Sequence, residues 1–213
     1  ILGAAALGIS NVLCLTGDTP EAGDQPEATP VFDITSSEFV SVVKQMRDNS
    51  VYPGGRTINS APRLLIGAAD APRKLDSDFK PTSILSKIEA GTDFFQTQYC
   101  FDMDILKAYM ARLADFGILE QTYFIIGIGP IASSKSARWM NKNLFGVNIP
   151  NEIILRLEQA KNPKLEGRKI CVELIQALSD IPGVSGAHLM APHGEEAAAM
   201  VISECGLLRE RKL

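Results

Sequence analysis

The chain has 213 residues, of which 46% are hydrophobic and 22% are charged, and its formal net charge is −4. This length and apolar content predict one soluble domain, residues 1–213, with a sizeable core. The acidic balance excludes the basic surface that nucleic-acid binding requires.

Cysteine and histidine usage argues against a metal centre. The four cysteines include no close pair of metal-ligand spacing, and each lies in an apolar segment: Cys14, Cys100, Cys171 and Cys205. Buried free thiols in a reducing compartment, the cytoplasm, are therefore expected. With only two histidines in the chain, no metal site is predicted.

The first fifteen residues are apolar but match neither a leader nor a membrane span. They lack a basic start and have no small residue before Cys14, as a signal peptide would require. Ser10 and Asn11 interrupt a run that is already too short to cross a bilayer. A helix over residues 1–8 ending at Gly8, then a strand, is expected, and the chain is therefore expected to start in the middle of a fold.

Five strands are predicted, and helices fill the gaps between them. The strand segments are residues 12–15, 63–68, 93–99, 123–128 and 186–190. The first run, residues 12–15, suits a strand buried on both faces. Alternating strands and helices predict a parallel sheet or a barrel.

Capping and spacing signals place the helices. Residues 35–38, Thr-Ser-Ser-Glu, form a capping box, with a buried stripe expected at Phe39, Val42, Val43 and Met46. A helix over residues 83–90 should stop at Gly91. Asp102 and Asp104 open the next helix, whose stripe is Leu106, Tyr109, Met110 and Leu113. A later stripe is Cys171, Leu174, Ile175 and Leu178.

Polar and small residues at strand ends are the candidate site. Residues 16–18, Thr-Gly-Asp, follow the first strand, where α/β enzymes place their chemistry, although an ordinary turn has the same composition. The small residues 67–69 either admit a flat ligand or simply pack closely. Lys87 could meet a phosphate or be a solvated helix residue.

Gln96 and Gln98 lie two residues apart in the third strand and therefore share a face. A buried amide needs partners, so one interpretation is a satisfied core network. An amide can also bind a heterocycle, and Gln98, closer to the carboxyl end, is the preferred ligand residue. His188, inside the last strand, is interpreted as a core histidine.

Residues 127–132 match the dinucleotide fingerprint G-x-G-x-x-A. Pro130 suits the tight turn poorly, and no acidic residue follows on a second strand at the required spacing. We therefore interpret Gly127 and Gly129 as positions where a flat ligand approaches a barrel strand.

Taken together, these strand ends resemble the methylenetetrahydrofolate reductase family. The matching segments are residues 13–18, 66–72, 90–102, 127–130 and 183–188, in the family's order and spacing. The resemblance implies a TIM (β/α)8 barrel of which this chain supplies the last five βα units. It also implies FAD, or FMN as the alternative, carrying a hydride from NAD(P)H to 5,10-methylenetetrahydrofolate in a ping-pong reaction.

The resemblance assigns roles to individual residues. Asp18 becomes the catalytic residue and lies beside both flavin and folate, and Gln98 binds the folate substrate. The flavin-binding set is Thr16, Gly17, Asp18, Thr35, Ser36, Gly67, Ala68, Ala69, Asp70 and Lys87. A homo-oligomer, with a second subunit as a further option, is expected, whereas nucleic acid and a membrane span are not.

Several departures from the family pattern keep alternatives open. Many members have Arg where Thr16 stands, a histidine and tyrosine where this chain has small residues and Asp70, and an asparagine where His193 stands. The family's strand with the general-acid glutamate has no counterpart here, so that glutamate is expected outside this chain. Five-eighths of a barrel would expose long strand edges, so the chain is expected to be the C-terminal part of a larger protein, or a proteolytic or partly recorded copy. A non-catalytic folate- or flavin-binding subunit and a folate-dependent barrel methyltransferase are the rival readings.

Overall fold

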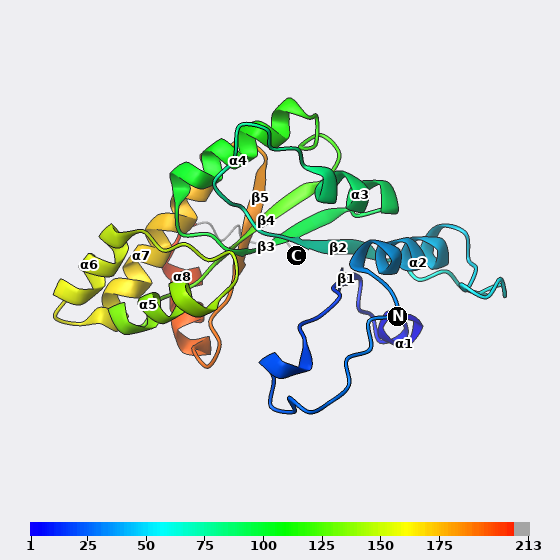
Figure 1. The fold of residues 1–213 in the computed structure, drawn as a ribbon, viewed down its shortest axis with the longest axis horizontal. Coiled ribbons are helices and arrows are strands. Elements are labelled where there is room, and N and C mark those ends of the chain that lie inside the picture. The colour runs from blue at the N-terminus through cyan, green and yellow to red at the C-terminus, as the bar shows by residue number, and fades with distance from the viewer. Residues whose placement is uncertain (207–213) are drawn as a thin grey trace. The chain divides into compact units, whose positions relative to one another are not determined.

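Five strands alternate with helices in the computed structural model of the protein, which describes residues 1–206. The strands are β1 (Asn11–Cys14), β2 (Leu65–Asp70), β3 (Phe94–Tyr99), β4 (Tyr123–Ile128) and β5 (Val184–Leu189). They form one sheet in the order β1-β2-β3-β4-β5 (Figure 1). The α/β class is confirmed, and the sequential order is that of consecutive βα units. Only β4 has the predicted bounds, and the other strands shift by one or two residues.

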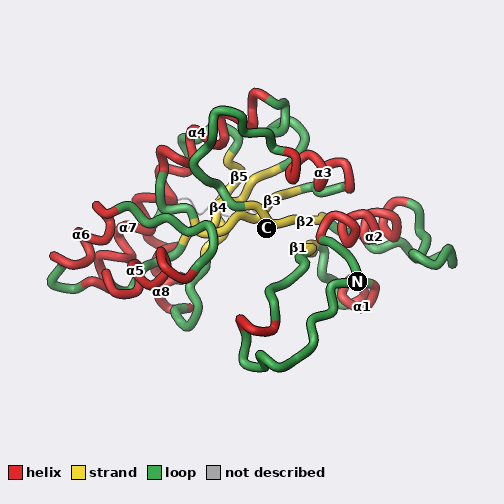
Figure 2. Tube along the Cα trace, in the orientation of Figure 1, coloured by secondary structure: helices red, strands yellow, loops and turns green. Residues whose placement is uncertain are grey.

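Helical segments alternate with the strands along the chain, as the red and yellow stretches of Figure 2 show. They are α1 (Leu2–Ala6), η1 (Pro20–Ala22), α2 (Ser36–Asp48), α3 (Thr82–Ala90), α4 (Met103–Asp115), α5 (Ser134–Asn143), α6 (Asn151–Gln159), α7 (Pro163–Leu178) and α8 (Glu195–Glu204). Gly8 and Gly91 take positive φ angles of 84° and 117° just after α1 and α3, which confirms both predicted helix stops. None of the described helices has both the length and the apolar character that crossing a membrane demands.

The chain divides into two compact units. The first contains residues 1–69 and 80–95, and the second contains residues 70–79 and those from 96 onward. The candidate residues are divided between them. Each unit is therefore described by itself.

In the first unit, β1 pairs in parallel with β2, with Leu13 opposite Gly67 and Cys14 opposite Ala68. The prediction that residues 12–15 are buried on both faces is wrong. Only Cys14 is fully buried, Val12 and Leu13 are half-buried, and Leu15 is 49% exposed. The reason is the position of β1 at the end of the strand order, where a strand has one neighbour.

Helix α2 begins with the predicted capping box. The Glu38 backbone N–H donates to Thr35 Oγ1 at 3.3 Å, and the Thr35 N–H donates to Glu38 Oε2 at 2.7 Å. These hydrogen bonds from the Thr35 backbone and side chain lower the pKa of Glu38. The predicted stripe needs correction, because Val40 joins Val43 and Met46 in the core while Phe39 and Val42 are only half-buried. The buried face is therefore rotated by about one residue around the helix.

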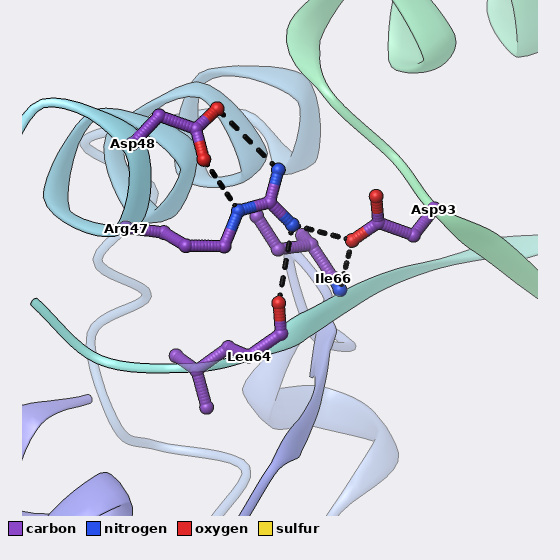
Figure 3. A network of polar contacts seen from close by, with 5 residues as sticks. All are labelled: Arg47, Asp48, Leu64, Ile66 and Asp93. Atoms are coloured by element: carbon purple, nitrogen blue, oxygen red, sulfur yellow. Dashed lines mark hydrogen bonds and ion pairs between the residues drawn. The ribbon is translucent and has the colours of Figure 1, made fainter.

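Arg47, near the end of α2, ties the helix to the starts of β2 and β3 (Figure 3). Its Nη1 donates to Asp93 Oδ2 at 2.6 Å and to the Leu64 carbonyl at 3.1 Å. The same Asp93 oxygen accepts the Ile66 N–H at 2.7 Å. Asp48 binds the other side of the guanidinium, and hydrogen bonds to Asp48 and then to Asp93 raise the pKa of Arg47.

We expect Asp93→Asn to lower the free energy of unfolding by about 1.5 kcal/mol. The substitution removes the charge that faces a guanidinium whose side chain is only 21% exposed. Urea denaturation of the native protein measures the change. Asp115→Asn is the matched control, because its pair with Arg112 is 39% and 64% exposed and should contribute under ~0.5 kcal/mol. Equal effects of the two substitutions would contradict a special role for the Arg47 network.

In the second unit, β4 pairs in parallel with β5, with Gly127 opposite His188. A buried cluster joins β4 to the helices that follow, and its members include Ile128, Ile154, Leu157, Ile170, Cys171, Ile175 and Val201. Asp102 caps α4 as predicted: its Oδ1 accepts the N–H groups of Asp104 and Ile105 at 3.1 and 3.0 Å. All four residues of the predicted α4 stripe are buried. On α7 the prediction holds except at Leu174, which is partly buried.

All four cysteines are buried free thiols, as expected. Burial raises the pKa of Cys14 to about 11 and those of Cys100 and Cys171 to about 12. These thiols therefore stay protonated at neutral pH and act as core residues.

Candidate functional site

The carboxyl edge of the β1–β2 pair in the first unit carries residues 16–18. Because Cys14 lies opposite Ala68 in a parallel pair, the segment after β1 and Ala69, near the end of β2, lie at the same edge of the sheet. Thr16, Gly17 and Asp18 are exposed, and a β-carbon on Gly17 would meet nothing within 4 Å. Gly17 also has a φ of 88°, which glycine adopts without strain. This edge is open to a ligand.

Lys87 reaches the same edge from α3. Its Nζ donates to the Ala69 carbonyl at 2.7 Å, and the side chain is partly buried. A solvated helix residue was one of the two alternatives for Lys87, and this contact argues against it. The hydrogen bond brings Lys87 and Ala69, two predicted flavin contacts, together. A fixed ammonium group at the end of a parallel strand suits an anionic group such as a phosphate.

Other predicted flavin contacts in this unit are already engaged by the chain itself. The Thr35 hydroxyl accepts from Glu38 and donates to it in the capping box. A β-carbon on Gly67 would overlap the Phe94 ring, so close packing explains this glycine. Ala68 is fully buried, and Ser36 is half-buried as the first residue of α2. Flavin contacts by these four residues remain predictions.

Asp70, in the second unit, lies against α4. Its Oδ2 accepts a hydrogen bond from the Tyr109 hydroxyl at 2.9 Å. Tyr109 is 1% exposed, and burial followed by the nearby Asp70 charge raises the pKa of its hydroxyl. The sequence placed Tyr109 in a buried stripe, and a buried hydroxyl needs an acceptor. The need of the buried Tyr109 hydroxyl for an acceptor was the sequence signal for this pair. The flavin role of Asp70 stays a prediction.

The two glutamines of β3 have different environments. The amide nitrogen of Gln96 lies 3.1 Å from His188 Nε2, so the two side chains are partners, but both are half-buried and His188 is not the fully buried core histidine expected. Burial lowers the pKa of His188, so the neutral imidazole can accept from Gln96. Gln98 Oε1 accepts the Tyr99 N–H at 2.9 Å, and its Nε2 donates to the Phe145 carbonyl at 3.3 Å. An amide has two donor hydrogens and two acceptor lone pairs, so Gln98 retains capacity for a ligand.

The glycines of the discounted fingerprint serve strand packing. A β-carbon on Gly127 would lie 2.6 Å from the Gln98 carbonyl oxygen, and one on Gly129 would overlap the Met190 carbonyl. Close packing therefore explains both glycines, and the approach of a flat ligand to them stays a prediction. The neighbouring backbones of this chain occupy that space.

A cavity of about 390 Å³ lies in the second unit, and Tyr99, the residue after Gln98, forms part of its wall. Three segments form its walls: the loop Pro72, Arg73 and Lys74, the β3–α4 junction with Tyr99, Cys100, Asp102 and Ile105, and the loop Gly146, Val147 and Asn148. The sequence analysis did not identify this cavity, because its three segments are far apart in the chain. In residues 1–206, no three His, Cys, Asp or Glu side chains gather in a way that could hold a metal ion.

A family described as methylenetetrahydrofolate reductase matches residues 1–206. Methylenetetrahydrofolate reductase 2 of Schizosaccharomyces pombe is 28% identical over 228 residues, covering 98% of this chain and 33% of that protein. The 5,10-methylenetetrahydrofolate reductase of Salmonella typhimurium is 24% identical over 204 residues, covering 94% of this chain and 62% of that protein.

The chain therefore spans about one third to three fifths of the length of these curated relatives. Among solved structures, one match is an uncharacterized protein from Clostridium thermocellum that binds two copies of 5-methyl-5,6,7,8-tetrahydrofolic acid. It is 19% identical in sequence and superposes with a TM-score of 0.47. The match covers 68% of this chain and 53% of the chain of that protein.

Proposed function

The chain belongs to the methylenetetrahydrofolate reductase family, and from this premise we propose that the protein reduces 5,10-methylenetetrahydrofolate to 5-methyltetrahydrofolate with NAD(P)H. The observation that carries the proposal is the edge of the β1–β2 pair, where Lys87 is bound to Ala69 and residues 16–18 are exposed. This edge combines a cation held by a hydrogen bond with an exposed backbone segment, and both features suit a phosphate-bearing cofactor.

The residues of this edge fit a flavin nucleotide in part. Lys87 would hold its phosphates, and the open backbone at Gly17 would border its ring. Thr35 and Gly67 contribute less, because their hydrogen bonds and space are used by Glu38 and Phe94. FAD is the proposed cofactor and FMN the alternative. The chemistry that a bound flavin supplies is hydride transfer from NAD(P)H to the folate, with the two substrates using one face in turn.

Asp18 and Gln98 have separate roles in the proposal. The Asp18 carboxylate disfavours added negative charge on a neighbouring ring and stabilises a cationic folate. The Gln98 amide orients the folate heterocycle by hydrogen bonding. The general acid of the reduction is proposed to lie outside these 213 residues.

Product analysis tests the proposed function. The purified native protein, supplied with FAD or FMN, is incubated with methylenetetrahydrofolate and either NADH or NADPH, and 5-methyltetrahydrofolate is measured by chromatography. We expect product with one of the nicotinamides. A protein that binds folate and flavin but forms no product would instead be a non-catalytic binding subunit, an alternative that the engaged Thr35 and Asp70 side chains favour.

We expect Lys87→Gln to weaken flavin binding by about tenfold, because a charge-assisted contact to phosphate contributes about 1.5 kcal/mol. Equilibrium dialysis of the apoprotein against FAD measures the change. Lys80→Gln is the control, since Lys80 is an exposed lysine of the same unit. Unchanged affinity in Lys87→Gln would remove the phosphate role and leave Lys87 as a tie between α3 and β2.

A further inference from the structure

We propose that the cavity lined by Arg73, Lys74 and Asn148 binds the anionic end of the substrate that lies on Gln98. Two substrates of the proposed reaction have such an end: the folate with its glutamyl carboxylates and NAD(P)H with its phosphates. The inference rests on the proposed function. It adds a binding site for the anionic end of a substrate, and none of the residues predicted to contact flavin or folate lines this site.

The cavity adjoins Gln98 through two direct links. Tyr99, the next residue of β3, forms part of its wall. The Gln98 amide also donates to the Phe145 carbonyl, and Gly146, Val147 and Asn148 of the same loop line the cavity. The Gln98 amide is therefore hydrogen-bonded to one of the loops that line the cavity, and the next residue of β3 stands in the cavity wall.

Two loops that line the cavity lie close to each other. A β-carbon on Gly146 would lie 3.4 Å from the Ala71 β-carbon, so the loop after α5 contacts the loop after β2. Tyr99 is fixed by its stacking on Phe101 at 5.6 Å and by its hydroxyl, which donates to the Met190 carbonyl at 3.1 Å. A volume of about 390 Å³ lies in the range of small-ligand sites.

The charges of the cavity favour an anion. Arg73 and Lys74 are both exposed, and the Arg73 guanidinium is placed 5.3 Å from the Phe79 ring centroid. Asp102 is the one carboxylate in the wall, and it is engaged: Oδ1 caps α4, and Oδ2 accepts from the Asn148 amide at 3.5 Å. The wall thus carries two cations and one carboxylate that is already hydrogen-bonded. The apolar wall residues Pro72, Ile105 and Val147 can cover a ligand's carbon atoms.

Steady-state kinetics of the Arg73→Gln/Lys74→Gln double variant tests the proposal. We expect KM for the anionic substrate to rise about five- to tenfold with kcat unchanged within about twofold, since each exposed charge contributes modestly. Comparing monoglutamyl with triglutamyl methylenetetrahydrofolate, and NADH with NADPH, shows which substrate's anion is bound. Lys107→Gln/Lys142→Gln removes the same charge at exposed sites outside the cavity and should change neither KM.

Direct binding separates this inference from the proposed function. Calorimetric titration with p-aminobenzoyl-triglutamate and with 2′,5′-ADP should show one probe bound by the native protein and weakened about five- to tenfold in the double variant. Such binding without any folate reduction would support the anion site and contradict the proposed function. Folate reduction with KM values and probe affinities unchanged in the double variant would overturn the anion site and leave the proposed function standing.

Discussion

Asp18→Asn protein will keep its flavin and its oxidation of NAD(P)H but will reduce methylenetetrahydrofolate about 100-fold more slowly. The amide has nearly the shape of the carboxylate, and Asp18 is exposed beside an open Gly17, so the fold should not respond. What the substitution removes is the negative charge that would stabilise a cationic folate. The measurement is the kcat of both half-reactions, with an artificial electron acceptor such as menadione for the nicotinamide half.

Asp24→Asn is the control for Asp18→Asn, because Asp24 is an exposed carboxylate of the same long loop. It should leave both half-reactions unchanged. If Asp18→Asn reduced folate at the native rate, residues 16–18 would be an ordinary strand-to-loop turn.

Gly129→Ala will lower the free energy of unfolding by about 3 kcal/mol. The added methyl group would overlap the Met190 carbonyl and lie 3.0 Å from Tyr99 Cε1, and a backbone carbonyl at a strand end cannot easily move aside. Urea denaturation measures the loss.

Gly186→Ala makes the matched comparison in the same sheet. Its β-carbon would lie 3.6 Å from Ile125 Cγ2, an ordinary contact, so the substitution should be neutral or slightly stabilising. A Gly129→Ala protein as stable as Gly186→Ala would restore the interpretation that Gly129 leaves room for a ligand.

Local signals predicted the parts of the fold that depend on neighbouring residues. The capping box at Thr35, the cap at Asp102 and the stop at Gly91 each involve groups within a few residues, so the sequence was sufficient. The burial of β1 was predicted wrongly, because burial depends on what lies beside a strand, and β1 ends the strand order.

The candidate site could likewise be predicted only in part. Its residue types and their position after β1 and β2 follow from the sequence, and so does the family. The partners of these side chains do not: Ala69 for Lys87, Tyr109 for Asp70 and His188 for Gln96 are all contacts between separate elements. The close packing at Gly127 and Gly129 was not predicted for the same reason, since the atoms that exclude a side chain belong to β3 and Met190.

The visible absorbance of flavin bound to the purified native protein, followed without oxygen, tests the central claim most directly. A reductase of this family should lose the absorbance when NADH or NADPH is added and regain it when methylenetetrahydrofolate follows. An absorbance that neither nicotinamide bleaches would contradict the proposed function.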